Sequence, residues 1–560
     1  MKRFDKEIRL LFIGAALAAT LGAFNADDRM IKKAAEAIND ASYRSQVEGL
    51  SADELEGRAP GSEGERKTIE YIEKEFLELG LQPVAGGDFR QDVALVEITG
   101  SGQKLSFNKG SGGMALAFGD DMVLGTRRVR PESSIAGSEV VFVGYGIDAP
   151  EFGWNDYAGV DMRGKTALIL VNDPGFVTGD ETLFRGKAMT YHGRWTYKFE
   201  EAARKGAAGA IIVHETAAAA YDWGVVRNGW SGPQFYLDRP DGNAGRTALE
   251  GWITEARARQ LMDLAGQDFD AMKAVAVKRG FKPVPLGVTA TGGVKNAIRH
   301  KRSPNLAGLM PGKDRPEEYV VYVAHWDHLG VAEEPSDDRI YNGAVDNATG
   351  VAGILTIARG FRDMLPGVSR SVLFIAATAE ESGLIGSEYY AEKPLVLLEK
   401  TAAVINIDAI QPLGRAKDVE VIGFGASDLE DLLSAAAKSQ NRTLTPDLRP
   451  EAGYFYRSDH FNFAKAGVPA LYLKSGTRLR DKPEGAGKAM VDDYYATRYH
   501  KPDDEYSESW DVSGSIEDLR LLFEVGARVA NSETWPEWRE GNEFRAAREK
   551  SAASRKPAEE

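Results

Sequence analysis

From residue 303 to residue 531, two kinds of apolar pattern alternate along the chain. Short runs rich in β-branched residues are typical of buried strands, and longer stretches with apolar residues at helical spacing are typical of amphipathic helices. Strands are predicted at 319–324, 371–376, 401–407, 419–423 and 469–473, and helices at 350–364, 385–392, 429–439 and 515–531. Because strands that alternate with helices form a parallel sheet covered on both faces, we predict an α/β fold with a mixed, largely parallel sheet and helices on both faces.

The region before residue 303 shows two further patterns. Residues 27–133 indicate a helix, a Gly/Pro turn and a second helix, followed by short strands. Residues 134–285 contain strand-like runs such as "KTALILVNDPGF", and "YKFEEAARKGAAGAIIVHE" indicates a helix, a glycine turn and an apolar strand. We therefore predict that residues 134–285 form a smaller inserted domain, and that residues 27–133 and 286–535 together form the main domain.

The two ends of the chain differ from the rest. Residues 1–26 begin with a basic-leaning stretch and contain an apolar run at 10–21, which is too short to span a bilayer comfortably but suits a secretory signal peptide. We expect this signal to direct export to the periplasm or the exterior, and the alternative is an N-terminal helix packed on the main domain. Residues 536–560 are charged and rich in Ala, Ser, Arg and Glu, which predicts a mobile tail.

Composition and charge narrow the classes of function. At 560 residues the chain is too long to fold around one ordinary hydrophobic core, so two or three domains are expected. The net charge of −15 argues against nucleic acid and anionic membrane surfaces as partners. Beyond the N-terminal signal, no stretch is long and apolar enough for a membrane span. The chain has no cysteine, so any metal ion must be held by His, Asp and Glu side chains.

Acidic and histidine side chains lie at the ends of the predicted strands or in loops that precede predicted helices. One such carboxylate alone is more often a helix cap or a solvated loop charge. In a parallel sheet, however, ligands gather beyond the carboxyl ends of the strands, and several carboxylates that converge there would repel one another without a cation. The residues in question are His325, Asp327, Asp346, Glu380, Glu381, Asp408 and His500.

The type of ligand narrows the choice of metal. Imidazole and carboxylate ligands without thiolate suit catalytic zinc, with manganese or cobalt as substitutes. Two histidines and three carboxylates can serve two ions if one carboxylate bridges them. Sites with two metal ions support hydrolysis, because they activate water and stabilise the developing oxyanion.

Six motifs, in this order and spacing, resemble the M28 zinc aminopeptidases, in particular bacterial members that carry a protease-associated (PA) insert. They are "AHWDHLG", "GAVDNATG", "TAEESGLIGSEYY", "INIDAI", "RSDHFNFAKAGVPAL" and "YHKPDDEY". The stretch "ADELEGRAPGSEGERKTIEYI" near the N-terminus extends the resemblance over most of the chain. The resemblance implies a fold of the zinc exopeptidase type, a PA-like insert over residues 134–285 and two bound zinc ions.

The resemblance also implies a role for each candidate ligand. Asp346 would bridge the two zinc ions. His325 and Asp408 would complete the site of one ion, and Glu381 and His500 would complete the site of the other.

Other residues near these ligands receive less direct roles. By the same resemblance, Glu380 would be the general base that takes a proton from the activated water. Asp327 would hydrogen-bond the distal nitrogen of His325 and fix its tautomer. His328 is interpreted as structural rather than a ligand. The tetrapeptide Arg457-Ser458-Asp459-His460 would lie near the substrate or behind the ligands, or would only cap a loop.

Two features outside these motifs admit a structural explanation. In "HGRWTYKFEEA", the aromatic residues Trp195, Tyr197 and Phe199 either form part of a lid over the site or pack in the core of the insert, and packing is favoured. Arg58 in "EGRAPG" could reach the site, although turn formation alone explains the neighbouring glycine and proline.

These observations favour a metal-dependent exopeptidase that removes N-terminal residues from peptides with a free N-terminus. Three alternatives remain open: a glutaminyl cyclase-like acyltransferase with one zinc ion, a carboxypeptidase of the same family with an arginine-rich pocket, and a PA-type binding protein without catalysis. The sequence does not define the oligomeric state or the preferred N-terminal residue.

Overall fold

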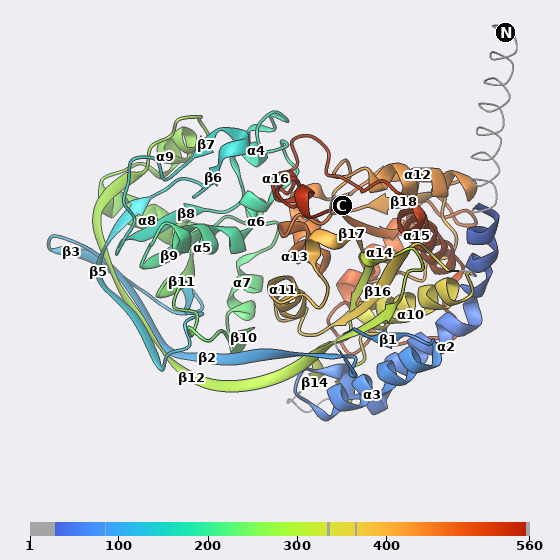
Figure 1. Ribbon diagram of the computed structural model, residues 1–560. Helices are drawn as coiled ribbons and strands as arrows, with labels where there is room; N and C mark the ends of the chain where they lie inside the picture. The colour runs from blue at the N-terminus through green and yellow to red at the C-terminus, as the bar shows by residue number, and fades with distance from the viewer. Residues whose placement is uncertain (1–27, 85, 333–336, 365–366, 556–560) are drawn as a thin grey trace, which may run out of the picture.

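The computed structural model of the protein describes residues 28–84, 86–332, 337–364 and 367–555. The chain forms two lobes, and two long strands, β2 (Arg90–Lys109) and β12 (Val284–Met310), run from one lobe to the other (Figure 1). The predicted signal peptide, residues 1–26, lies outside the described residues. Within the described ranges, no helix has the length and apolar character needed to cross a membrane.

The main lobe contains a mixed sheet in which most neighbouring strands are parallel. In spatial order its strands are β19 (Thr443–Pro446), β18 (Asp418–Val421), β20 (Ala470–Ser475), β17 (Thr401–Asn406), β13 (Arg315–His325), β16 (Arg370–Ala377) and β12. Of the six neighbouring pairs in this order, β18–β20 and β16–β12 are antiparallel and the other four are parallel. The predicted class of fold is therefore confirmed, and each of the five predicted strands overlaps an observed one.

The central strand β13 shows why this sheet is covered on both faces. Val320, Tyr322 and Ala324 belong to one hydrophobic core, whereas Val321 and Val323 belong to the other, because successive side chains of a strand point to opposite faces. All five are at most 1% exposed. The first core is formed with α2 (Asp40–Leu50), α3 (Glu63–Glu78), α10 (Thr349–Arg362), α12 (Leu429–Ser439) and α15 (Ser513–Asn531), and the second with α11 (Ile385–Glu392) and α13 (His460–Lys465).

The second lobe is built on the same principle with a parallel sheet of its own, which is continuous with that of the main lobe. Its parallel strands are β5 (Glu132–Phe142), β8 (Thr166–Leu170), β9 (Gly209–His214) and β11 (Leu249–Thr254). Its helices are α4 (Pro174–Thr178), α5 (Trp195–Arg204), α6 (Thr216–Ala219), α7 (Trp223–Gly229), α8 (Glu255–Ala265) and α9 (Phe269–Ala276).

Residues before the predicted start of the insert also contribute to the second lobe. β4 (Met122–Gly125) is antiparallel to β11, and β3 (Gly112–Leu116) pairs with the far end of β2. The boundary at residue 134 stays a prediction, but the sheet of this lobe draws on residues assigned by the sequence to the main domain. The cause is the long β2–β12 pair, which carries the chain into the lobe before the apolar βαβ pattern begins.

The aromatic residues of α5 pack within the second lobe. Phe199 and Tyr197 are 0% and 3% exposed, and the ring centroid of Trp195 lies 5.9 Å from that of Phe199. This arrangement agrees with the interpretation of these residues as core rather than lid.

The C-terminal segment packs on the main lobe. α16 (Arg545–Lys550) carries Arg548, which is 1% exposed and donates hydrogen bonds to the carbonyls of Thr401, Ala402 and Pro536. Trp538 is equally buried. The prediction of a mobile tail is therefore wrong for residues 536–555, because charged side chains in this segment satisfy carbonyl groups of the sheet.

Candidate metal centre

The candidate site lies where three neighbouring parallel strands of the main lobe end. Two loops that reach the same edge of the sheet complete it. His325 ends β13, Glu380 and Glu381 follow β16, Asp408 follows β17, Asp346 precedes α10, and His500 follows α14 (Ala486–Thr497). The predicted convergence of these side chains is therefore present in the structure, although they are up to 175 residues apart in the sequence.

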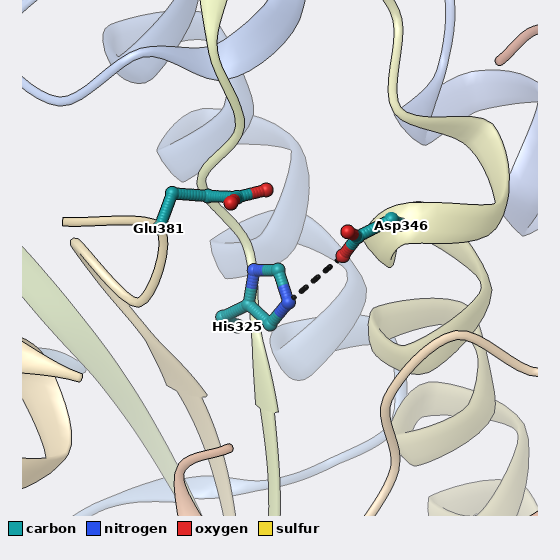
Figure 2. Close-up of side chains that lie close together, drawn as sticks. All are labelled: His325, Asp346 and Glu381. Carbon is teal, nitrogen blue, oxygen red and sulfur yellow. Dashed lines mark ion pairs between the residues drawn. The ribbon is translucent and has the colours of Figure 1, made fainter. Parts of the chain in front are cut away.

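The imidazole of His325 faces carboxylates from several of these segments. Its Nε2 atom lies 3.2 Å from Asp346 Oδ1 and 3.7 Å from Asp408 Oδ1. Glu380 Oε2 is 3.9 Å from the same nitrogen. Figure 2 shows the ring of His325 between Asp346 and Glu381, which come from different loops.

The second histidine, His500, faces the other side of Asp346. Its Nε2 atom lies 3.2 Å from Asp346 Oδ2 and 3.1 Å from Glu381 Oε2. The two oxygens of Asp346 thus face two different histidines. Each histidine has a further carboxylate of its own, Asp408 for His325 and Glu381 for His500, so the five side chains form two groups that share Asp346.

The chemistry of these groups fits metal cations. All of the candidate ligand atoms are nitrogen or carboxylate oxygen. Two sets that share His325 and also draw in Glu380, namely His325–Asp346–Glu381 and His325–Glu380–Asp408, each have their ligand atoms within 4.8 Å of one another. Among the described residues, no lysine or arginine forms an ion pair with these carboxylates, whose only charged partners are histidines. Buried carboxylates this close together require positive charge, which divalent metal ions would provide. The nitrogen and oxygen atoms offered by these side chains are ligand types that zinc prefers.

The pKa values of the site residues also indicate that the carboxylates need positive charge nearby. Burial alone would lower the pKa of each histidine, but the surrounding carboxylates outweigh it: they raise the pKa of His325 well above its usual range and that of His500 to about 10. Conversely, burial favours protonation of the carboxyls, yet the histidines hold the pKa of Asp346 well below its usual range, and His500 and His328 help to hold that of Glu381 at about 2. Asp346 and Glu381 thus keep their negative charge, which favours the binding of cations beside them.

Glu380 differs from the other carboxylates. Burial, reinforced by Asp408 and Glu381, raises its pKa well above the usual range. No described residue donates a hydrogen bond to its side chain, whereas the loop that carries it is fixed: the backbone N–H groups of Glu380 and Glu381 donate to the Asp327 carboxylate at 3.0 and 3.3 Å.

Asp327 therefore acts on the site differently from the prediction. His325 Nδ1 lies 3.1 Å from the backbone carbonyl oxygen of Asp327 but 3.8 Å from its carboxylate, which is too far for a hydrogen bond. Because the backbone leaves the strand after His325, the carbonyl rather than the side chain faces the ring. The carboxylate, 0% exposed, instead anchors the loop with Glu380 and Glu381.

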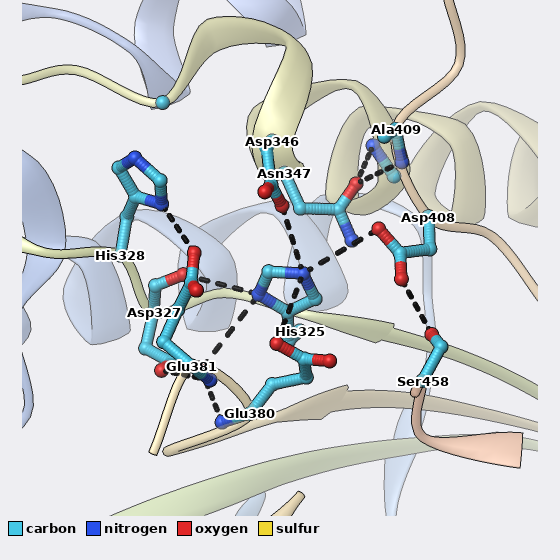
Figure 3. Close-up of polar contacts among 12 residues, drawn as sticks. His325, Asp327, His328, Asp346, Asn347, Glu380, Glu381, Asp408, Ala409 and Ser458 are labelled. Atoms are coloured by element: carbon cyan, nitrogen blue, oxygen red, sulfur yellow. Dashed lines mark hydrogen bonds and ion pairs between the residues drawn. The ribbon is translucent and has the colours of Figure 1, made fainter. Parts of the chain in front are cut away.

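Further polar contacts hold the ligand loops in place (Figure 3). Ser458 Oγ donates to Asp408 Oδ2 at 2.5 Å and accepts from Asn406. Asn347, which follows Asp346 through a cis peptide bond, accepts from the N–H of Ala409 at 3.1 Å and so joins the Asp346 loop to the Asp408 loop. Of the tetrapeptide at 457–460, Ser458 thus supports a candidate ligand directly.

His328 has the supporting role that the sequence favoured. Its Nδ1 lies 2.6 Å from Glu381 Oε1, the oxygen of Glu381 other than the one that faces His500. His328 fixes this carboxylate from behind, so the pair of histidines in "HWDH" serves the two candidate metal groups separately.

Two supporting residues were missed by the sequence analysis or left undecided. Asp504, in the quoted motif "YHKPDDEY", accepts from the backbone N–H groups of Val345 and Asp346 at 3.1 and 3.0 Å. Arg58 is 1% exposed and donates to four backbone carbonyls, those of Leu50, Trp326, Asn342 and Gly343. Neither contact has a local sequence signal, because both bind backbone groups far away along the chain.

Comparison with known proteins bears on the part of the chain that carries the candidate site. Residues 305–523 match the model of peptidase family M28. The predicted family is thus confirmed for the segment that contains all seven candidate site residues.

Similar proteins cover different shares of the chain. Aminopeptidase NAALADL1 of Mus musculus is 34% identical over 137 residues, which cover 23% of this chain and 17% of the relative. The glutamate carboxypeptidase 2 homolog of Caenorhabditis elegans is 26% identical over 323 residues, which cover 49% and 38%. The chain thus matches well under half the length of these curated relatives. A solved aminopeptidase from Aneurinibacillus sp. strain AM-1 is 20% identical, with 90% of this chain and 96% of that chain covered and a TM-score of 0.47.

Proposed function

We propose that the protein is an aminopeptidase that hydrolyses the N-terminal bond of peptides at a site with two zinc ions. The observation that carries the proposal is the shared carboxylate: Asp346 faces His325 with one oxygen and His500 with the other, at 3.2 Å each. His325, Asp346 and Asp408 would hold one ion, and His500, Asp346 and Glu381 the other. When bound, the ions would supply Lewis acidity, which lowers the pKa of water and polarises the peptide carbonyl.

Glu380 is the proposed general base. A general base must lie next to the metal ligands without being a ligand itself. Among the described residues, none donates a hydrogen bond to the side chain of Glu380. The direction of its pKa shift favours a carboxylate that can hold a proton taken from water and then give it to the leaving amine. Asp327 supports this role because it fixes the backbone of Glu380 and Glu381.

The similar proteins include both aminopeptidases and carboxypeptidase homologues, so cleavage from the N-terminus rather than the C-terminus is part of the proposal. A full ligand set for two ions favours hydrolysis over a cyclase with one zinc ion. We also propose that residues 1–26 direct export and that the second lobe is a PA-like insert which borders the entrance to the site.

Peptide hydrolysis with purified, zinc-loaded protein tests this function. We expect cleavage of peptides with a free N-terminus and none of the same peptides after N-acetylation. Glu380→Gln should retain zinc and lose at least about 100-fold in kcat, since general-base catalysis contributes about 10²–10⁴-fold. Cleavage of N-blocked peptides from the C-terminus, or full activity of Glu380→Gln, would refute the proposal.

A further inference from the structure

The loop that carries Glu380 packs against the second lobe as well as against the main lobe. Ala379 directly precedes this residue, and Ile385 begins α11 a few residues after it. β10 (Pro233–Leu237), which lies between α7 and β11 in the chain, pairs with β2 (Figure 1). Ala379 and Ile385 are buried in one small hydrophobic cluster with side chains of β2 and β10, namely Val93, Leu95 and Leu237. A strand of the second lobe is thus part of the surface on which the loop of the proposed base rests.

The same loop has an unfavourable backbone conformation near both of its ends. Ala379 has a φ of 52° and Leu384 a φ of 62°, in the left-handed region that residues with a Cβ atom disfavour. Residues keep such a conformation only where the surrounding structure imposes it. Ala379 is 1% exposed within the cluster that β10 helps to form, so contacts with the second lobe contribute to holding this loop in its strained shape.

Arg239, two residues after β10, adds a charged connection from the second lobe to α11. Its guanidinium group donates to Glu388 Oε1 at 2.8 Å and to both carboxylate oxygens of Glu392. Arg246, from the same segment, lies 4.0 Å from Glu388 Oε1. Because residues four positions apart share one face of a helix, a single arginine binds both glutamates and so fixes the direction of α11.

Arg239 is itself fixed within the second lobe. Its Nη1 atom donates to Asn243 Oδ1 at 3.3 Å, and Asn243 is 4% exposed. The amide nitrogen of Asn243 donates in turn to the carbonyls of Arg127 and Leu237, each at 3.0 Å. The rigid fork of the guanidinium group therefore has one side held by the second lobe and presents the other side to α11.

The start of α11 is hydrogen-bonded to the loop that carries the proposed base. Three backbone N–H groups donate to three carbonyls at 2.9, 3.1 and 2.9 Å: Leu384 to Glu380, Ile385 to Ala379 and Gly386 to Thr378. The position of α11 therefore sets the position of the backbone of Glu380. Since no described residue donates a hydrogen bond to the Glu380 side chain, this backbone is what holds its carboxyl group in place.

We propose that Arg239 is a positioning residue for the general base: by tying α11 to the second lobe, it holds Glu380 where it can take a proton from water. This inference rests on the proposed peptidase function. It gives the second lobe a part in turnover beyond bordering the entrance to the site. Glu381, the neighbouring candidate ligand, is also fixed by His328 at 2.6 Å, so we expect loss of Arg239 to affect the base and not the binding of zinc.

The kinetics of zinc-loaded Arg239→Gln test the inference. We expect kcat to fall about 10-fold, while KM stays within about twofold and the zinc content equals that of the wild type, because support behind a reacting group is lost and the binding groups remain. Arg239→Lys keeps the charge but reaches fewer carboxylate oxygens, so it should recover part of kcat. An unchanged kcat, or an effect confined to KM, would contradict the positioning role.

The partners of Arg239 and a matched arginine provide the controls. Glu388→Gln and Glu392→Gln together should lower kcat as Arg239→Gln does, and all three changes combined should cause no further loss, since they remove the same contact. Losses that add up would contradict the inference. Arg259 likewise binds two carboxylates, at 2.7 and 2.8 Å, but both belong to the second lobe, so Arg259→Gln should leave kcat within about twofold. Thermal unfolding verifies that each variant is folded.

Hydrogen exchange measured by mass spectrometry decides the role of Arg239 even if no peptide is cleaved. In Arg239→Gln, the backbone amides of residues 379–392 should exchange at least about 10-fold faster than in the wild type, whereas those of β13 should not change. Equal exchange of residues 379–392 in the two proteins would overturn the inference. Absence of hydrolysis by the zinc-loaded wild type would refute the peptidase function separately.

Discussion

At the scale of single residues, the site depends on carboxylates whose two oxygens each face a different histidine. Asp346 divides its two oxygens between His325 and His500, and Glu381 divides its own between His500 and His328. Each of these carboxylates is thereby fixed from two directions, which lowers the cost of presenting it to a cation.

Supporting residues at this scale act through the backbone. The carboxylate of Asp504 accepts the N–H groups of Val345 and Asp346, and that of Asp327 accepts those of Glu380 and Glu381. Two buried aspartates thus position two ligand loops without touching the ligand side chains. The repulsion that such buried negative charge creates is a further reason for the site to hold cations.

At the scale of elements, the short 3₁₀ segment η2 (Asp53–Arg58) joins the N-terminal helices to the metal centre. Gly57 has a φ of 63°, and any side chain there would lie 2.4 Å from the carbonyl oxygen of Gly330, so the chain passes very close to the ligand loops. Arg58 then reaches between them and donates to the carbonyls of Trp326 and Gly343, among others. The helices before residue 60 are therefore part of the site's framework.

This connection predicts the effect of Arg58→Lys. Lysine keeps the charge but cannot reach four carbonyls at once, so we expect zinc affinity to fall about 10-fold, as is typical when support behind metal ligands is lost. Competition with a chromophoric chelator measures the affinity, and urea unfolding measures stability. Arg66→Lys, on the exposed face of α3, is the matched control. Unchanged zinc affinity in a folded Arg58→Lys protein would show that η2 does not support the site.

At the scale of the whole molecule, the two lobes are joined by more than the long β2–β12 pair. Lys465 of α13 lies 3.4 Å from Glu200 of α5, and Tyr191 of the second lobe donates to the same glutamate. The ring of Tyr191 also packs on Phe461 of the main lobe, with centroids 5.0 Å apart. Glu200 is thus a charged group in the contact between the lobes.

The contact between lobes predicts a pH dependence of stability. Burial opposes ionisation of Glu200, but Lys465, Tyr191 and nearby arginines outweigh it and lower its pKa to about 2. A lowered pKa stabilises the folded state above the ordinary pKa of about 4.3, and this contribution is lost as the pH falls towards 2. We expect Glu200→Gln to cost about 2 kcal/mol more at pH 7 than at pH 3, measured by urea unfolding.

The exposed Glu181 of the same lobe provides the control for this prediction. Glu181→Gln should change the free energy of unfolding equally at both pH values. If Glu200→Gln behaved in the same way as this control, the ion pair between the lobes would not contribute to the stability of the folded protein.

The sequence predicted much of the fold and the members of the site. β13 and its neighbours were found because their apolar runs are local, and His325, Glu381 and Asp408 were found because parallel strands end at one edge. Asp504 and the packed tail at Arg548 were not found, and Arg58 was left undecided, since their partners are backbone groups of distant segments that leave no periodic or compositional trace.

The central claim is that Asp346 joins two metal ions in one site. Metal analysis by mass spectrometry after exhaustive dialysis against zinc-containing and then zinc-free buffer tests it most directly. The wild type should retain two zinc ions per chain, and Asp346→Asn, folded as judged by circular dichroism, should retain at most one. Retention of a single ion by the wild type, or of two ions by Asp346→Asn, would contradict the claim.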